Sequence, residues 1–79
     1  MDPQACLSRL LAAVSDNDTE EAICAAEDLL NWLDRGGAAP PVTRQDRFSL
    51  FDLTQTLRTD RDGQKTVADL IGRLFPPHL

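Results

Sequence analysis

Apolar residues recur along this chain with the spacing of amphipathic α-helices. The first set follows the i, i+3, i+4, i+7 pattern that places side chains on one helical face, and it consists of Leu7, Leu10, Leu11 and Val14. Asp2 and Pro3 before it favour a helix start, because Asp can cap and Pro fits the first turn. The polar residues 15–18 favour a turn. We therefore predict a first helix that ends near Ser15.

A second helix should start at Asp18, because Glu21 stands three residues later in a capping-box arrangement. Its apolar face is broad enough to predict the most buried helix of the protein. The central stripe is Ile23, Ala26, Leu30 and Leu33, with Ala22, Ala25, Leu29 and Trp32 beside it. Arg35 and the pair Gly36-Gly37 predict the helix end, since glycine accepts the left-handed backbone on which helices commonly end.

The second half of the chain repeats this organisation. Thr43 with Asp46 predicts a third helix start, and its apolar face should be Leu50, Leu53, Thr54 and Leu57, flanked by Phe51 and extended by Phe48. The run Thr59 to Gly63 favours a turn. A fourth helical face follows, formed by Val67, Leu70, Ile71 and Leu74 and ended by Pro76-Pro77.

This order predicts an all-α fold, a compact bundle of about four helices built from two α-hairpins joined by a Pro/Gly-rich connector. A chain of 79 residues has room for one core, so we expect a single domain. It divides into an acidic first hairpin (1–35), the connector (36–42), a second hairpin (43–75) and a tail (76–79). The expected core is Leu7, Leu10, Leu11, Val14, Ile23, Ala26, Leu30, Leu33, Leu50, Leu53, Leu57, Val67, Leu70, Ile71 and Leu74.

Charge is distributed unevenly between the two halves. The formal net charge is −5. Residues 1–40 hold eight Asp and Glu against two Arg, a net charge of −6, whereas residues 41–79 hold six Lys and Arg against five Asp, a net charge of +1. An acidic protein is not expected to bind nucleic acid or an anionic membrane directly. The uneven charge instead favours a basic partner, or self-association that pairs the two halves.

Few residues offer catalytic or metal-binding chemistry. Cys6, Cys24 and His78 are too few for a structural zinc site, and a base for nucleophilic catalysis is lacking apart from His78 at the chain end. The acidic turn 60–63 departs from a calcium loop, because Lys65 occupies a position that is normally apolar. We therefore expect no enzymatic activity, no metal and no cofactor.

Two cysteines are also too few for a disulfide framework, which favours free thiols and a cytoplasmic protein without a membrane segment or signal peptide. Whether Cys6 and Cys24 approach each other depends on the register of the first hairpin, which the sequence leaves open.

A protein contact is the remaining function that the sequence favours. Trp32 either covers the end of the core or, with Leu29 or Leu33, forms an exposed apolar patch that docks a partner or a second copy. The candidate contact residues are Trp32, Leu29, Glu20, Glu21, Glu27 and Asp28. We expect a non-enzymatic, homodimeric interaction module. The alternative is an acidic regulator whose carboxylates occupy a basic, nucleic-acid-binding surface of a target protein.

Overall fold

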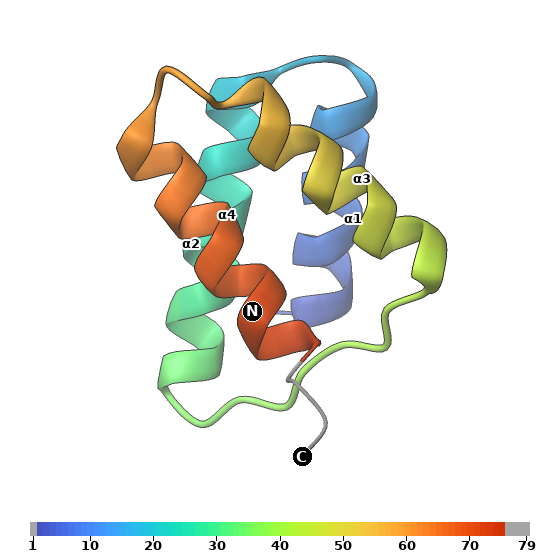
Figure 1. The fold of residues 1–79 in the computed structure, drawn as a ribbon. Coiled ribbons are helices and arrows are strands. Elements are labelled where there is room, and N and C mark those ends of the chain that lie inside the picture. Colours follow the sequence, from blue (N-terminus) through green and yellow to red (C-terminus); the bar gives the residue numbers. More distant parts are fainter. Residues whose placement is uncertain (1, 76–79) are drawn as a thin grey trace.

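The structure, a computed structural model that describes residues 2–75, contains four α-helices and no strand in that range (Figure 1). The helices are α1 (Pro3–Ser15), α2 (Thr19–Asp34), α3 (Arg44–Thr56) and α4 (Arg61–Leu74). The predicted all-α bundle of two hairpins is confirmed. The predicted tail 76–79, including the proline stop, lies outside the described residues. No helix of the described range is both long and apolar enough to cross a membrane.

Each helix begins at a side chain that caps its free backbone N–H groups. Asp2 accepts a hydrogen bond from the backbone of Gln4, and Asp18 accepts one from the backbone of Glu21. Thr43 and Asp46 form a reciprocal capping box, with both hydrogen bonds at 3.1 Å. These three predicted starts are confirmed, because the capping groups lie where the sequence pattern indicates.

The start of α4 differs from the prediction. The run from Thr59 to Gly63 was expected to be a turn, but the helix already begins at Arg61, with Asp60 as its cap and Gly63 inside its first turn. Gly63 is buried against α2, and a Cβ atom there would lie 2.7 Å from Cδ1 of Ile23. Glycine at this position lets the start of α4 approach α2 closely.

The ends of α1 and α2 share one backbone geometry. Asn17 after α1 and Gly36 after α2 adopt positive φ angles of 58° and 86°. At each end the next residue donates a backbone hydrogen bond to a carbonyl five residues earlier, as in a Schellman motif: Asp18 to Ala13 at 2.9 Å and Gly37 to Trp32 at 3.0 Å. The stop predicted at the glycine pair is confirmed.

The four helices form two layers. In Figure 1 the hairpin of α1 and α2 lies behind, and α3 and α4 cross in front of it. Contacts link the helices in a ring, since α2 packs on α1 and α4 while α3 packs on α1 and α4. The helices α2 and α3 therefore lie diagonally across the bundle. The ion pair between Arg73 of α4 and Asp34 of α2 joins the two layers near their shared end.

The core is built from leucines and, in the α1–α2 hairpin, from small residues. The buried face of α2 centres on Ala22, Ala25, Ala26 and Leu29, all with no exposed surface. Small side chains let α1 approach α2 closely, so the face is rotated from the predicted stripe. Five residues of the predicted core are only half-buried: Leu11, Val14, Ile23, Leu30 and Leu33.

Two further predictions about the core are wrong. The helix α2 was expected to be the most buried, yet it holds four buried residues against five in α4, because one of its sides faces solvent. Phe48 was expected to extend the buried face of α3 and Phe51 to flank it, but they are 64% and 42% exposed. At 100° per residue Phe48 lies opposite Leu50, Leu53 and Leu57, and Phe51 lies beyond the edge of their face.

Candidate interaction surfaces

Phe48 and Phe51 form an exposed aromatic pair on α3. They are the large hydrophobic side chains most exposed in the described chain, and they lie three residues apart, on adjacent turns of one helical face. Arg44 and Arg47 are exposed beside them. We call these four residues the α3 aromatic surface. Aromatic and arginine side chains of this kind dominate the energetics of protein interfaces.

Arg47 is held in place by two aromatic rings. Its guanidinium carbon lies 5.4 Å from the ring centroid of Phe51 and 5.2 Å from that of Phe75, the residue that follows α4. Both distances are within the range of cation–π attraction. The stacking fixes the guanidinium face while its N–H edges remain able to donate to a carboxylate. The α3 aromatic surface is therefore partly preorganised.

Trp32 lies at the junction of α2 and the connector. Its side chain is half-buried, and the indole Nε1 donates a hydrogen bond to the carbonyl oxygen of Ala38 at 2.9 Å. Gly37 passes directly over the ring, since a Cβ atom there would lie 2.2 Å from Cε2 of Trp32. A hollow of about 390 Å³ adjoins the indole, with Asp28 and Asn31 in its wall. The indole thus holds the connector against the end of α2, where Trp32 was predicted to cover the end of the core.

Leu29 does not belong to an exposed patch with Trp32. Its side chain has no exposed surface and lies in the core with Ala25 and Ala26. The rotation of the buried face of α2 toward the small residues turns Leu29 inward. Its proposed role as a contact residue is therefore corrected, and Leu29 is a core residue.

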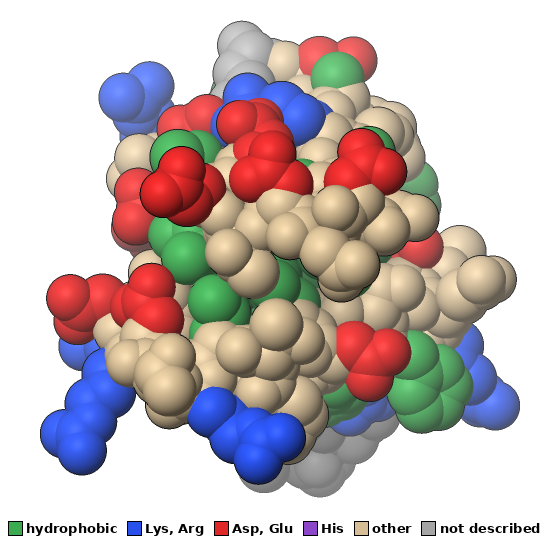
Figure 2. Space-filling view, turned by 90° about the horizontal axis from the view of Figure 1, so that it is seen from above, with side chains coloured by type: hydrophobic (Ala, Val, Ile, Leu, Met, Phe, Trp, Pro, Cys, Tyr) green, Lys and Arg blue, Asp and Glu red, His purple; other side chains and the backbone are tan. Residues whose placement is uncertain are grey.

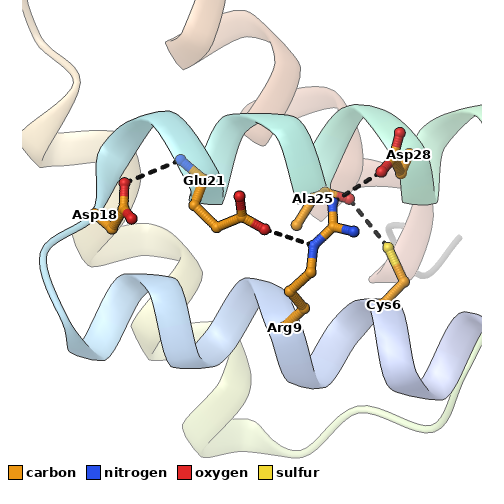
Figure 3. A network of polar contacts seen from close by, with 6 residues as sticks. All are labelled: Cys6, Arg9, Asp18, Glu21, Ala25 and Asp28. Atoms are coloured by element: carbon orange, nitrogen blue, oxygen red, sulfur yellow. Dashed lines mark hydrogen bonds and ion pairs between the residues drawn. The ribbon is translucent and has the colours of Figure 1, made fainter.

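The four predicted carboxylates of α2 divide into two pairs. Glu21 and Asp28 point toward α1 and share Arg9, whose Nε lies 2.8 Å from Glu21 Oε1 and whose Nη2 lies 2.8 Å from Asp28 Oδ2 (Figure 3). The hydrogen bond that Arg9 donates to Asp28 raises the pKa of Arg9 above its ordinary value. Both carboxylates are therefore paired with Arg9 within the α1–α2 hairpin.

Glu20 and Glu27 are exposed, and neither has a cationic partner among residues 2–75. They share the solvent side of α2 with Cys24 and Asn31, at positions i, i+4, i+7 and i+11 of one helical stripe. We call Glu20, Cys24, Glu27 and Asn31 the α2 acidic stripe. Figure 2 views the end of the molecule that carries the α1–α2 turn, and carboxylates gather there over the half that contains α1 and α2.

The two cysteines do not approach each other as a bonded pair. Cys6 is buried, and its thiol donates a hydrogen bond to the carbonyl oxygen of Ala25 at 3.3 Å (Figure 3). Cys24 is exposed, and both thiols are free. Burial raises the pKa of the Cys6 thiol, which keeps it protonated. A protonated, buried thiol is a poor nucleophile.

A second hollow, of about 410 Å³, lies between the α1–α2 turn and the second half of α3. Its polar walls include Asp18, which caps α2, and Thr56, whose hydroxyl donates to the backbone of Asp52. These groups are engaged in helix caps and turns, and the described walls bring no nucleophile next to a base.

Comparison with known proteins gives no relative from which a role could be transferred: no family model, no curated protein and no solved structure matches this chain.

The sequence analysis missed the α3 aromatic surface as a candidate site. The signal was present, because on a helical projection Phe48 lies about 160° from Leu50 and Phe51 about 160° from Leu53.

Proposed function

We propose that this protein is a small, non-enzymatic interaction module that associates with other copies of itself through the α3 aromatic surface. The observation that carries the proposal is the exposure of Phe48 and Phe51, at 64% and 42%, on adjacent turns of α3. Exposed aromatic residues grouped with arginines are typical of interfaces, whereas single exposed apolar residues are not informative. This surface takes the place that the sequence analysis gave to Trp32 and Leu29.

The experiment is the solution mass, measured by light scattering behind size exclusion over a range of protein concentrations. The wild type should exceed the monomer mass as concentration rises, and Phe48→Gln/Phe51→Gln should stay monomeric. Gln4→Ala, which removes an exposed polar side chain of α1, is the control and should behave as the wild type. A wild type that remains monomeric throughout would refute self-association.

A second candidate function is an acidic regulator that engages a basic surface on a target protein. It is supported by the exposed, unmatched carboxylates Glu20 and Glu27 and by the grouping of carboxylates over the α1–α2 hairpin (Figure 2). Binding to immobilised polyarginine at low and high salt tests it. The wild type should bind more tightly than Glu20→Gln/Glu27→Gln, and equal binding by the two proteins would contradict this role.

A further inference from the structure

We infer that the α3 aromatic surface of one copy binds the α2 acidic stripe of a second copy, so that the molecules associate head to tail. The inference rests on the proposed function and specifies both the partner and the geometry of the contact.

The α3 aromatic surface presents an apolar centre together with positive charge. Phe48 is the most exposed large apolar side chain of the described chain, and Arg44 and Arg47 lie beside it on the N-terminal side. Neither arginine forms an ion pair within residues 2–75. A partner for this surface must therefore supply carboxylates around a site that can receive a ring.

The α2 acidic stripe has the complementary composition. Glu20 and Glu27 are seven residues apart, two helical turns or roughly 10 Å along the helix axis. Cys24 lies between them on the same stripe and is small, exposed and weakly polar. A phenyl ring can lie over Cys24 while guanidinium groups approach the flanking carboxylates.

Arg9 determines which carboxylates of α2 remain for this contact. It neutralises Glu21 and Asp28 on the side of α2 that faces α1, through two contacts of 2.8 Å (Figure 3). Asp34 is likewise paired with Arg73 on the side that faces α4. The unmatched carboxylates of the α2 helix body are thus confined to the central, solvent-facing stripe, where a second molecule can reach them.

The positions of the two surfaces determine the type of assembly. The helices α2 and α3 lie diagonally across the ring of helix contacts and in different layers (Figure 1). Their solvent faces therefore point away from each other, and two copies cannot exchange both contacts at once. Such a heterologous contact leaves one surface free at each end and continues to a third copy. The assembly grows with concentration in place of the closed homodimer expected from the sequence.

The experiment uses two variants that each disable one surface. Arg44→Glu/Phe48→Gln disables the α3 aromatic surface, and Glu20→Gln/Glu27→Lys disables the α2 acidic stripe. Asp16→Asn/Asp69→Lys raises the net charge by as much as Glu20→Gln/Glu27→Lys does, at exposed positions outside both surfaces, and is the matched control for that variant. Far-UV circular dichroism checks that each variant is folded, and Glu20→Gln/Glu27→Gln replaces the lysine variant if that protein loses helicity.

Light scattering from about 10 μM to about 1 mM, the range of weak association, should give a wild-type mass that passes the dimer and keeps rising. Each surface variant alone should be a monomer, and the control should follow the wild type. An equimolar mixture of the two surface variants should form dimers and stop there, because the mixture holds one intact surface of each kind. About 0.5 M NaCl should reduce the wild-type mass, since exposed charge pairs are then largely screened.

The outcomes separate this inference from the proposed function. A wild type that stays monomeric overturns both. A different result would be a wild-type mass that levels off at the dimer, with a monomeric α3 variant and an α2 variant that still dimerises. That result would support self-association but overturn the head-to-tail contact in favour of α3 pairing with α3. Absence of a dimer in the mixture, with both variants folded, also overturns the head-to-tail contact.

Discussion

Replacing Gly37 by alanine should destabilise this protein more than the same change at either of two other glycines. An alanine Cβ at residue 37 would lie 2.2 Å from Cε2, 2.4 Å from Nε1 and 2.5 Å from Cδ2 of Trp32. Atoms cannot approach so closely, so the indole must move away from the connector. Its hydrogen bond to Ala38 is then lost together with its packing on the backbone.

The expected cost follows from these two losses. A hydrogen bond of this kind contributes about 1 kcal/mol, and overpacking at a filled site costs about 1–3 kcal/mol. We therefore expect Gly37→Ala to reduce the free energy of unfolding by about 2–4 kcal/mol. A domain of this size is stable by only about 3–5 kcal/mol. The variant should be close to unfolding at room temperature.

Gly36 and Gly72 serve as controls, because neither has atoms close to the position that an alanine Cβ would occupy. Gly36 has open space around its missing Cβ but a φ of +86°, so alanine there should cost about 1–2 kcal/mol through backbone strain alone. Gly72 is exposed within α4 and also has open space, so alanine there should stabilise the helix by about 0.5–1 kcal/mol.

The assay is urea unfolding followed by fluorescence, since Trp32 is the single tryptophan and the chain has no tyrosine. With an m value of about 1 kcal/mol per M, the midpoint for Gly37→Ala should fall by about 2–4 M. Its folded-state emission should also shift, because the indole is displaced. If Gly37→Ala unfolds at the wild-type midpoint with unchanged emission, Trp32 does not hold the connector against α2.

Three further predictions concern the helix caps, the thiols and the hairpin ion pairs. Thr43→Ala removes half of the capping box with Asp46 and should cost about 1 kcal/mol in urea unfolding, whereas an unchanged midpoint would show that the cap is not formed. Burial raises the pKa of Cys6 above its ordinary value of 9.0, so the unfolded chain loses this proton first and stability should fall as pH rises above about 9. Cys6→Ala should remove that pH dependence, while Cys24→Ala should retain it. Arg9→Met should lower the urea midpoint only slightly, because its two ion pairs are roughly half-exposed, and the loss should shrink in concentrated NaCl; a large, salt-independent loss would mean that packing of the Arg9 stem dominates.

The helices and their boundaries were predictable because they depend on local chemistry. Asp18 and Thr43 cap their helices with hydrogen bonds to residues three positions away, and Gly36 ends α2 through its own φ angle. Such interactions are encoded within a few residues of sequence. The start of α4 was misplaced although Asp60 caps it locally, because Gly63 was assigned to a turn. The burial of Gly63 inside the helix instead reflects its packing against Ile23, forty residues earlier in the chain. No local pattern contains that contact.

The surfaces were less predictable because they depend on how the helices pack. Glu21 and Asp28 resemble Glu20 and Glu27 in sequence, yet only the first pair meets Arg9 across the hairpin. Leu29 resembles Leu30, but the close approach of α1 to the alanine face of α2 buries Leu29 completely. The sequence specifies which residues are apolar or charged, whereas the packing of the hairpin determines which of them remain exposed.

The tight α1–α2 hairpin has a consequence for how the chain folds. These two helices form the most extensive helix pair of the molecule and are joined only by residues 16–18, whereas residues 35–43 separate the hairpins. Forming the first hairpin therefore requires the closure of only a short loop. We expect it to be structured in the folding transition state, so that a change at Ala25 slows folding. A change in the connector should instead accelerate unfolding, because the second hairpin docks after the transition state has been crossed.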